Sequence, residues 1–109
     1  MVQFLQEQKQ AISIICEYYK VSQLYVFGSI LTNHFNETSD IDFLVTFNEG
    51  IELEQYAEYY FGLKFALEDL LGRDIDLVES ITLRNKYFIV EIDNTKQILY
   101  ESESFKVSA

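Results

Sequence analysis

Two aspartates near the middle of this chain have the spacing of residues that bind a cation together. Asp40 and Asp42 flank Ile41 at the start of an apolar run that continues to Phe47. In a strand, positions i and i+2 point to the same face, about 7 Å apart. Two like charges on one face of a core strand need compensation, which a divalent cation such as Mg²⁺ supplies. The alternative is that both carboxylates are solvated at a strand's beginning, where aspartate often forms turns.

The dipeptide Gly28-Ser29 ends the preceding apolar run, Leu24 to Phe27, ten residues before Asp40. Glycine lets a ligand approach the backbone, and the residues after it offer N–H groups and a hydroxyl to a phosphate. If the two runs are antiparallel neighbours, the dipeptide and the aspartate pair lie at the same edge of a sheet. A simple turn is the alternative for a Gly-Ser pair.

A second aspartate pair, Asp74 and Asp76, repeats the alternation in a later apolar run that ends at Val78. A third carboxylate beside a cation-binding pair can orient a hydroxyl nucleophile or accept its proton. Spacing alone leaves the choice between Asp74 and Asp76 open.

The elements that must position these residues alternate between helix and strand. We expect strands at 24–27, 40–47, 73–78 and 98–100, and helices at 2–20, 51–71 and 81–93. Ser29 is a candidate cap for a short helical turn, Ser80 or Thr82 for the last helix, and Gly72 ends the long one. Because the ten-residue link is short for a crossover helix, the first two strands should be antiparallel. The fold class is therefore α/β (α+β), a small mixed β-sheet with helices packed on it.

Composition narrows the class of protein. The 109 residues make one domain, 1–109, in which the polar segment 101–109 is expected to be a flexible tail. The net charge of −10 with only 8 basic residues argues against direct nucleic-acid binding. No apolar run is long enough to span a membrane, Met1 to Glu7 has no signal-peptide pattern, and Cys16 stands alone. A cytoplasmic protein is expected.

The order Gly28-Ser29, ten residues, Asp40-Ile41-Asp42 and a later third carboxylate resembles the signature of the DNA polymerase β-like nucleotidyltransferase superfamily. Within it, the chain is most similar to the minimal nucleotidyltransferases (MNT), antitoxins of HEPN/MNT toxin–antitoxin pairs. The resemblance covers Leu24 to Tyr100 and includes Leu67-Glu68-Asp69-Leu70-Leu71-Gly72, Asp76-Leu77-Val78 and Ile98-Leu99-Tyr100. It implies the polymerase β-like nucleotidyltransferase fold.

The resemblance also implies a role for each matching residue. Gly28 and Ser29 would bind the phosphates of ATP. Asp40, Asp42 and Asp76 would be catalytic and would bind two Mg²⁺ ions, with Asp76 favoured over Asp74 by its setting before Leu77-Val78. The implied reaction is transfer of AMP from ATP to a hydroxyl, a tyrosine of a cognate HEPN toxin RNase, as an antitoxin. Hetero- and homo-oligomers both stay open.

One segment departs from the family pattern. Similar proteins usually continue Gly-Ser with two arginines and a glycine, whereas this chain has Ile30-Leu31-Thr32-Asn33. Asn33 could adopt the left-handed conformation of the missing glycine. Arg73 or Lys86 could replace the missing charge, but the favoured interpretation of each is an ordinary surface cation. The departure keeps a second interpretation open, a catalytically weak or inactive module that neutralises its partner by complex formation. A third, modification of a small molecule, would ordinarily need an added acceptor-binding site.

Overall fold

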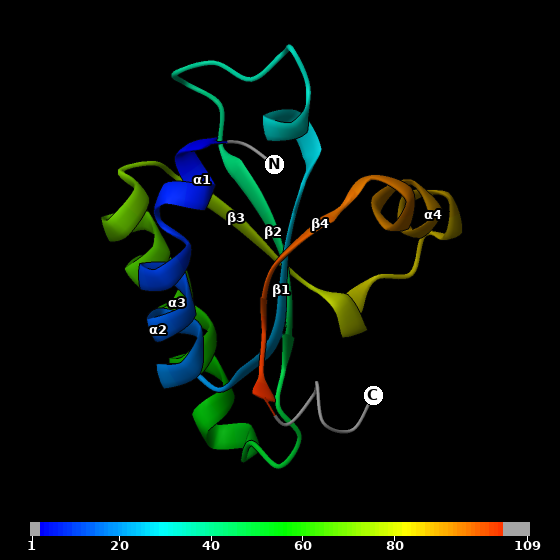
Figure 1. Cartoon of the computed structure of the whole chain (residues 1–109). Helices are drawn as coiled ribbons and strands as arrows, with labels where there is room; N and C mark the ends of the chain where they lie inside the picture. The colour runs from blue at the N-terminus through cyan, green and yellow to red at the C-terminus, as the bar shows by residue number, and fades with distance from the viewer. Residues whose placement is uncertain (1–2, 104–109) are drawn as a thin grey trace.

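The computed structural model describes residues 3–103, which form four α-helices, four β-strands and two short 3₁₀ turns (Figure 1). In chain order these are α1 (Gln3–Glu7), α2 (Lys9–Tyr18), β1 (Val21–Phe27), η1 (Gly28–Leu31), β2 (Ile41–Phe47), α3 (Leu53–Leu71), β3 (Ile75–Glu79), η2 (Ser80–Thr82), α4 (Lys86–Thr95) and β4 (Gln97–Glu101).

The four strands form one mixed sheet in the order β3-β2-β1-β4. β1 pairs antiparallel with both β2 and β4, whereas β2 and β3 run parallel. The predicted antiparallel pairing of the first two strands is therefore confirmed, as is the mixed α+β fold class.

The helices are divided unequally between the two faces of the sheet. Figure 1 shows α1, α2 and α3 together on one side and α4 on the other. Ile41, Phe43 and Val45 alternate along β2 and belong to the main apolar core beneath the first three helices. Leu44 points to the opposite face, where it packs with Phe27 of β1 and with Ile92 of α4. The intervening position, Asp42, shares that second face by the alternation of the strand.

Several element boundaries differ from the sequence-based predictions. The predicted helix 2–20 is two helices, with Gln8 between them and its N–H donated to the Leu5 carbonyl. β1 begins at Val21 rather than Leu24, because Lys20 turns the chain with a φ of 62°. The last helix begins at Lys86 rather than residue 81, since Asn85 caps it and not Ser80 or Thr82. Gly72 ends α3 in the left-handed conformation, as predicted.

The end of the chain is only partly described. Glu101 belongs to β4 and Ser102 is buried, so the first residues of the predicted tail are part of the fold. Residues 104–109, which make up the rest of that predicted tail, lie outside the described residues. Between residues 3 and 103, no helix combines the length and the apolar character needed to cross a membrane.

Candidate active site

The strand register brings three of the predicted residues to one place. Asp42 of β2 is the pairing partner of Phe27, the last residue of β1, so it lies beside Gly28. On its other side, Asp42 pairs in register with Asp76 of β3. Asp42, near the start of β2, therefore lies between Gly28, which directly follows β1, and Asp76 of β3.

The carboxyl groups of Asp42 and Asp76 lie close enough for each to act on the proton affinity of the other. Burial, followed by the charge of Asp76, raises the pKa of Asp42 from 3.8 to about 6. The charge of Asp40 raises the same pKa further, while the Ser29 backbone N–H lowers it by donating to the carboxylate. Two carboxylates on adjacent strands repel each other, and a cation bound between them would compensate that repulsion.

Gly28 is fitted against the Asp42 side chain. Its φ is +83°, a conformation that L side chains rarely adopt. A Cβ atom at this position would overlap Asp42 Oδ2 and would stand 3.0 Å from Cγ and 3.3 Å from Cβ of the same residue. Glycine is thus required here both by the backbone and by the proximity of the carboxylate.

A cleft of about 720 Å³ opens over this pair of aspartates. The residues that line it come from the four strands, from η1 and the loop after it, and from α4. The lining residues are Phe27, Gly28, Ser29, Leu31, Thr32, His34, Asp42, Asp76, Val78, Phe88, Glu91, Ile92, Thr95 and Gln97. Four of the five predicted site residues, Gly28, Ser29, Asp42 and Asp76, therefore share one cavity.

The fifth predicted residue, Asp40, lies in a neighbouring hollow of about 400 Å³, which it lines together with Asp74. Asp40 precedes the first residue of β2 and is exposed, whereas Asp42 is half-buried. The charge of Asp40 contributes, as the smallest of several causes, to the raised pKa of Asp42. Asp74 uses its backbone carbonyl to accept the Ile41 N–H at 3.1 Å. The structure therefore places Asp76, and not Asp74, beside Asp42.

The donor set fits a hard cation held jointly by protein and substrate. No three His, Cys, Asp or Glu side chains in the described part of the chain form a ready-made metal-ligand cluster. Mg²⁺ is commonly bound by one or two carboxylates with substrate phosphates and water completing its shell. Asp42 and Asp76 are such a pair, and a divalent cation would compensate the repulsion that, after burial, raises the pKa of Asp42.

The loop after η1 is held by Arg73, so this cation does not supply the charge that the loop lacks. Its guanidinium donates to the carbonyls of Asn36 (2.7 Å) and Ser39 (2.9 Å) and lies 4.3 Å from the Phe35 ring centroid. Lys86 does not line the cleft either. Arg73 therefore stabilises the loop that connects η1 to β2.

Two smaller expectations about this loop are wrong. Asn33 does not adopt a left-handed conformation, since Lys20 is the one non-glycine residue between 3 and 103 with a positive φ. Ser29 does not cap η1 through its hydroxyl, because Phe27 occupies the N-cap position without a side-chain hydrogen bond. The Ser29 N–H instead orients the Asp42 carboxylate, a role that spacing alone did not indicate.

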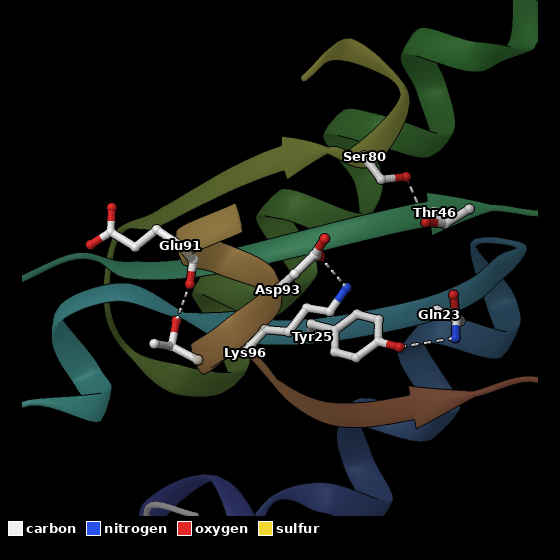
Figure 2. A network of polar contacts seen from close by, with 8 residues as sticks. Gln23, Tyr25, Thr46, Ser80, Glu91, Asp93 and Lys96 are labelled. Carbon is white, nitrogen blue, oxygen red and sulfur yellow. Dashed lines mark hydrogen bonds and ion pairs between the residues drawn. The ribbon is translucent and has the colours of Figure 1, made fainter. Parts of the chain in front are cut away.

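The fourth helix closes the cleft on the side away from α1–α3. Phe88 packs edge-on against Phe27 with 6.2 Å between ring centroids. Lys96 directly follows the helix, and its Nζ lies 4.3 Å from the centroid of the Tyr25 ring and 2.9 Å from Asp93 Oδ1 (Figure 2). Figure 2 also shows the hydrogen bond between Gln23 and Tyr25. These contacts hold α4 against the sheet and place its residues Glu91 and Thr95 in the cleft wall.

Comparison with known proteins identifies the family. Residues 8–101 match the sequence model of the nucleotidyltransferase domain. MJ0128 of Methanocaldococcus jannaschii, provisionally named a protein adenylyltransferase, is 40% identical over 80 residues, covering 73% of this chain and 78% of that protein. The chain belongs to the minimal nucleotidyltransferase family. It is accordingly an enzyme of the nucleotidyltransferase class.

Solved structures agree with this family assignment. A structure described provisionally as a minimal nucleotidyltransferase is 31% identical, with a TM-score of 0.66, covering 85% of this chain and 90% of that chain. The solved complex of a tri-AMPylated Shewanella oneidensis HEPN toxin with an MNT antitoxin also matches, with a TM-score of 0.62 over 95% of this chain and 78% of that chain. Its 18% identity shows a shared fold.

Proposed function

We propose that this minimal nucleotidyltransferase transfers AMP from ATP to a tyrosine hydroxyl of a HEPN-domain toxin RNase, with Mg²⁺, and thereby acts as an antitoxin in the cytoplasm. The observation that carries the proposal is the contact between Asp42 and Asp76 in a cleft bordered by Gly28 and Ser29. A carboxylate pair of which Asp42 is half-buried and Asp76 is exposed, beside a glycine that admits close approach, is suited to nucleotide chemistry.

The reaction follows from these groups. The tyrosine oxygen attacks the α-phosphorus of ATP and forms a new P–O bond, while the bond between the α-phosphorus and the bridging oxygen to the β-phosphate breaks. Pyrophosphate leaves with that electron pair. Asp76 accepts the proton of the tyrosine hydroxyl, and Asp42, oriented by the Ser29 N–H, lies beside it.

Asp42 and Asp76, with Asp40 from the adjoining hollow, would hold Mg²⁺. When bound, the cation supplies charge compensation for the triphosphate and for the leaving pyrophosphate. The family resemblance indicates two such ions. The protein's own contribution is to place the carboxylates on adjacent strands in register, so that their separation is set by the sheet.

Three observations support a protein acceptor. The chain's charge of −10 opposes binding of RNA or DNA. Next to the cleft, η2 and α4 leave Ile81, Tyr87 and Val90 largely exposed, at 67%, 87% and 58% of their surfaces. Exposed apolar side chains near a site favour a protein partner. The relative MJ0128 is provisionally named a protein adenylyltransferase, and the HEPN toxin in the similar complex carries AMP.

A labelling experiment tests the proposal. The protein is incubated with Mg²⁺, a HEPN-domain RNase encoded beside it, and ATP labelled on either the α- or the γ-phosphate. We expect the RNase to become labelled from α-labelled ATP only. Mass spectrometry should locate the label on a tyrosine, and the labelled RNase should lose its activity. Asp42→Asn should abolish the label, whereas the matched control Asp74→Asn should keep it.

Absence of label would overturn the enzymatic proposal. If the wild type and Asp42→Asn both still inhibited the RNase, the protein would act by complex formation alone. The absence of lysine and arginine from the described cleft lining is the structural observation that favours this alternative.

A further inference from the structure

The cleft that would bind ATP has an unusual charge balance. Its described lining contains the carboxylates Asp42, Asp76 and Glu91 but no lysine or arginine. Two basic residues near these positions in sequence are engaged elsewhere: Lys96 contacts Tyr25 and Asp93, and Arg73 binds the loop carbonyls. Lys86, two residues before Phe88, does not line the cleft. A triphosphate with several negative charges would therefore meet an acidic wall unless another group carries positive charge.

His34 is the one histidine of that lining, and the imidazole is the one side chain there that can become a cation. It comes from the loop between η1 and β2. The Thr32 hydroxyl fixes this part of the loop, because it donates to the Ser29 carbonyl at 2.8 Å and accepts the His34 backbone N–H at 3.1 Å. The backbone of His34 is thus tied, through one side chain, to the turn that carries Gly28 and Ser29.

We propose that His34 is a substrate-binding residue that donates a hydrogen bond to the β- or γ-phosphate of ATP, the portion that leaves as pyrophosphate. The inference rests on the proposed function, since ATP is the donor there. Gly28 and Ser29 border the same cavity, so a triphosphate bound along η1 would pass the His34 imidazole. A neutral or cationic imidazole donates N–H to phosphate oxygen, and the cationic form also supplies charge.

Binding measurements distinguish this role from a structural one. The affinity of the full chain for AMP-PNP and for AMP is measured by calorimetry with Mg²⁺, for the wild type, His34→Ala, His34→Arg and Asn33→Ala. Asn33 is the matched control, because it is exposed and adjacent but does not line the cleft. Thermal unfolding of each variant verifies that it is folded.

We expect His34→Ala to weaken AMP-PNP binding roughly tenfold, the effect of one charge-assisted hydrogen bond. AMP binding should not change, because AMP lacks the β- and γ-phosphates. His34→Arg should retain the affinity for AMP-PNP, since a guanidinium also binds phosphate, and Asn33→Ala should match the wild type.

Two results would overturn the role of His34. One is unchanged AMP-PNP affinity in His34→Ala, and the other is an equal loss for AMP and AMP-PNP, which would place His34 at the nucleoside or the α-phosphate. Failure of the wild type itself to bind AMP-PNP would instead overturn the proposed function, and the role of His34 with it. The two failures are therefore distinguishable from the wild-type measurement alone.

Discussion

Alanine at Gly28 tests whether the backbone at the start of η1 determines the position of the Asp42 carboxylate. The added Cβ would overlap Asp42 Oδ2 and would crowd Cγ at 3.0 Å. Rotation of the carboxylate about its terminal bond leaves Cγ in place, so the whole side chain must shift. Gly50 provides a matched control, because its φ of +87° is close to the +83° of Gly28 and nothing lies within 4 Å of its added Cβ.

The magnitudes follow from these two environments. Placing alanine at a positive φ costs roughly 1 kcal/mol, which we expect for Gly50→Ala. Gly28→Ala should cost about 2 kcal/mol, because it also disturbs the hydrogen bond from the Ser29 N–H to Asp42. A displaced catalytic group can lower the rate about hundredfold, so nucleotidyl transfer should fall by about that factor in Gly28→Ala alone.

The assay combines urea unfolding with the initial rate of AMP transfer for the wild type and both variants. A Gly28→Ala protein that transfers AMP as fast as Gly50→Ala would refute the reasoning. It would mean that the contact between Gly28 and Asp42 has no part in positioning the carboxylate.

Three further predictions concern the charges around the site. Because burial and the charge of Asp76 raise the pKa of Asp42 to about 6, the cation-free wild type should lose stability as the pH rises from about 4 to about 6. At about pH 8, Asp42→Asn should therefore be more stable than the wild type, by on the order of 1 kcal/mol after solvent screening. At about pH 4 the two proteins should be equally stable. Equal stability at both pH values, measured in EDTA-treated samples, would contradict this prediction. Mg²⁺ should raise the melting temperature of the wild type and of Asp74→Asn but not of Asp76→Asn, and a rise in all three would place the cation elsewhere. Arg73→Ala should lower the free energy of unfolding in urea by about 2 kcal/mol, since two carbonyls and an aromatic face lose their partner. It should also increase hydrogen exchange near Asn36. Unchanged exchange would show that other contacts hold the loop.

The arrangement of Gly28 and Asp42 could be predicted because it depends on local information. A short link between two apolar runs favours antiparallel strands, and antiparallel pairing brings the end of one run to the start of the next. The structure pairs Phe27 with Asp42 accordingly. The position of Asp76 depends on the parallel register of β3 with β2, which the sequence pattern did not predict. The choice of Asp76 over Asp74 came from the family resemblance.

The positions of Asp40 and His34 could not be predicted in this way. Alternation places Asp40 on the face of Asp42 only while the chain is in a strand, and β2 begins one residue later, at Ile41. His34 faces the cleft because of the hydrogen bonds of Thr32 within an irregular loop, for which no periodicity exists. The absence of arginine from Ile30 to Asn33 was the one signal that could have directed attention to it.

The start of α4 was misplaced for a related reason. Ser80 and Thr82 are good cap residues by type, but the chain forms a 3₁₀ turn there and Asn85 accepts the N–H groups of Tyr87 and Phe88 instead. Several candidate caps within six residues cannot be ranked by propensity alone. Packing of Ile92 and Phe88 against β1 and β2 decides which of them begins the helix.

The most direct test of the central claim compares Asp76→Asn with Asp74→Asn in the rate of AMP transfer to the HEPN-domain RNase. The two residues are two positions apart, yet only Asp76 contacts Asp42. We predict a loss of at least about a hundredfold in kcat/KM for Asp76→Asn, the usual effect of removing a catalytic acid–base group, and a change of less than about threefold for Asp74→Asn. An equal loss in both variants, or a larger loss in Asp74→Asn, would contradict the assignment of the site to Asp42 and Asp76.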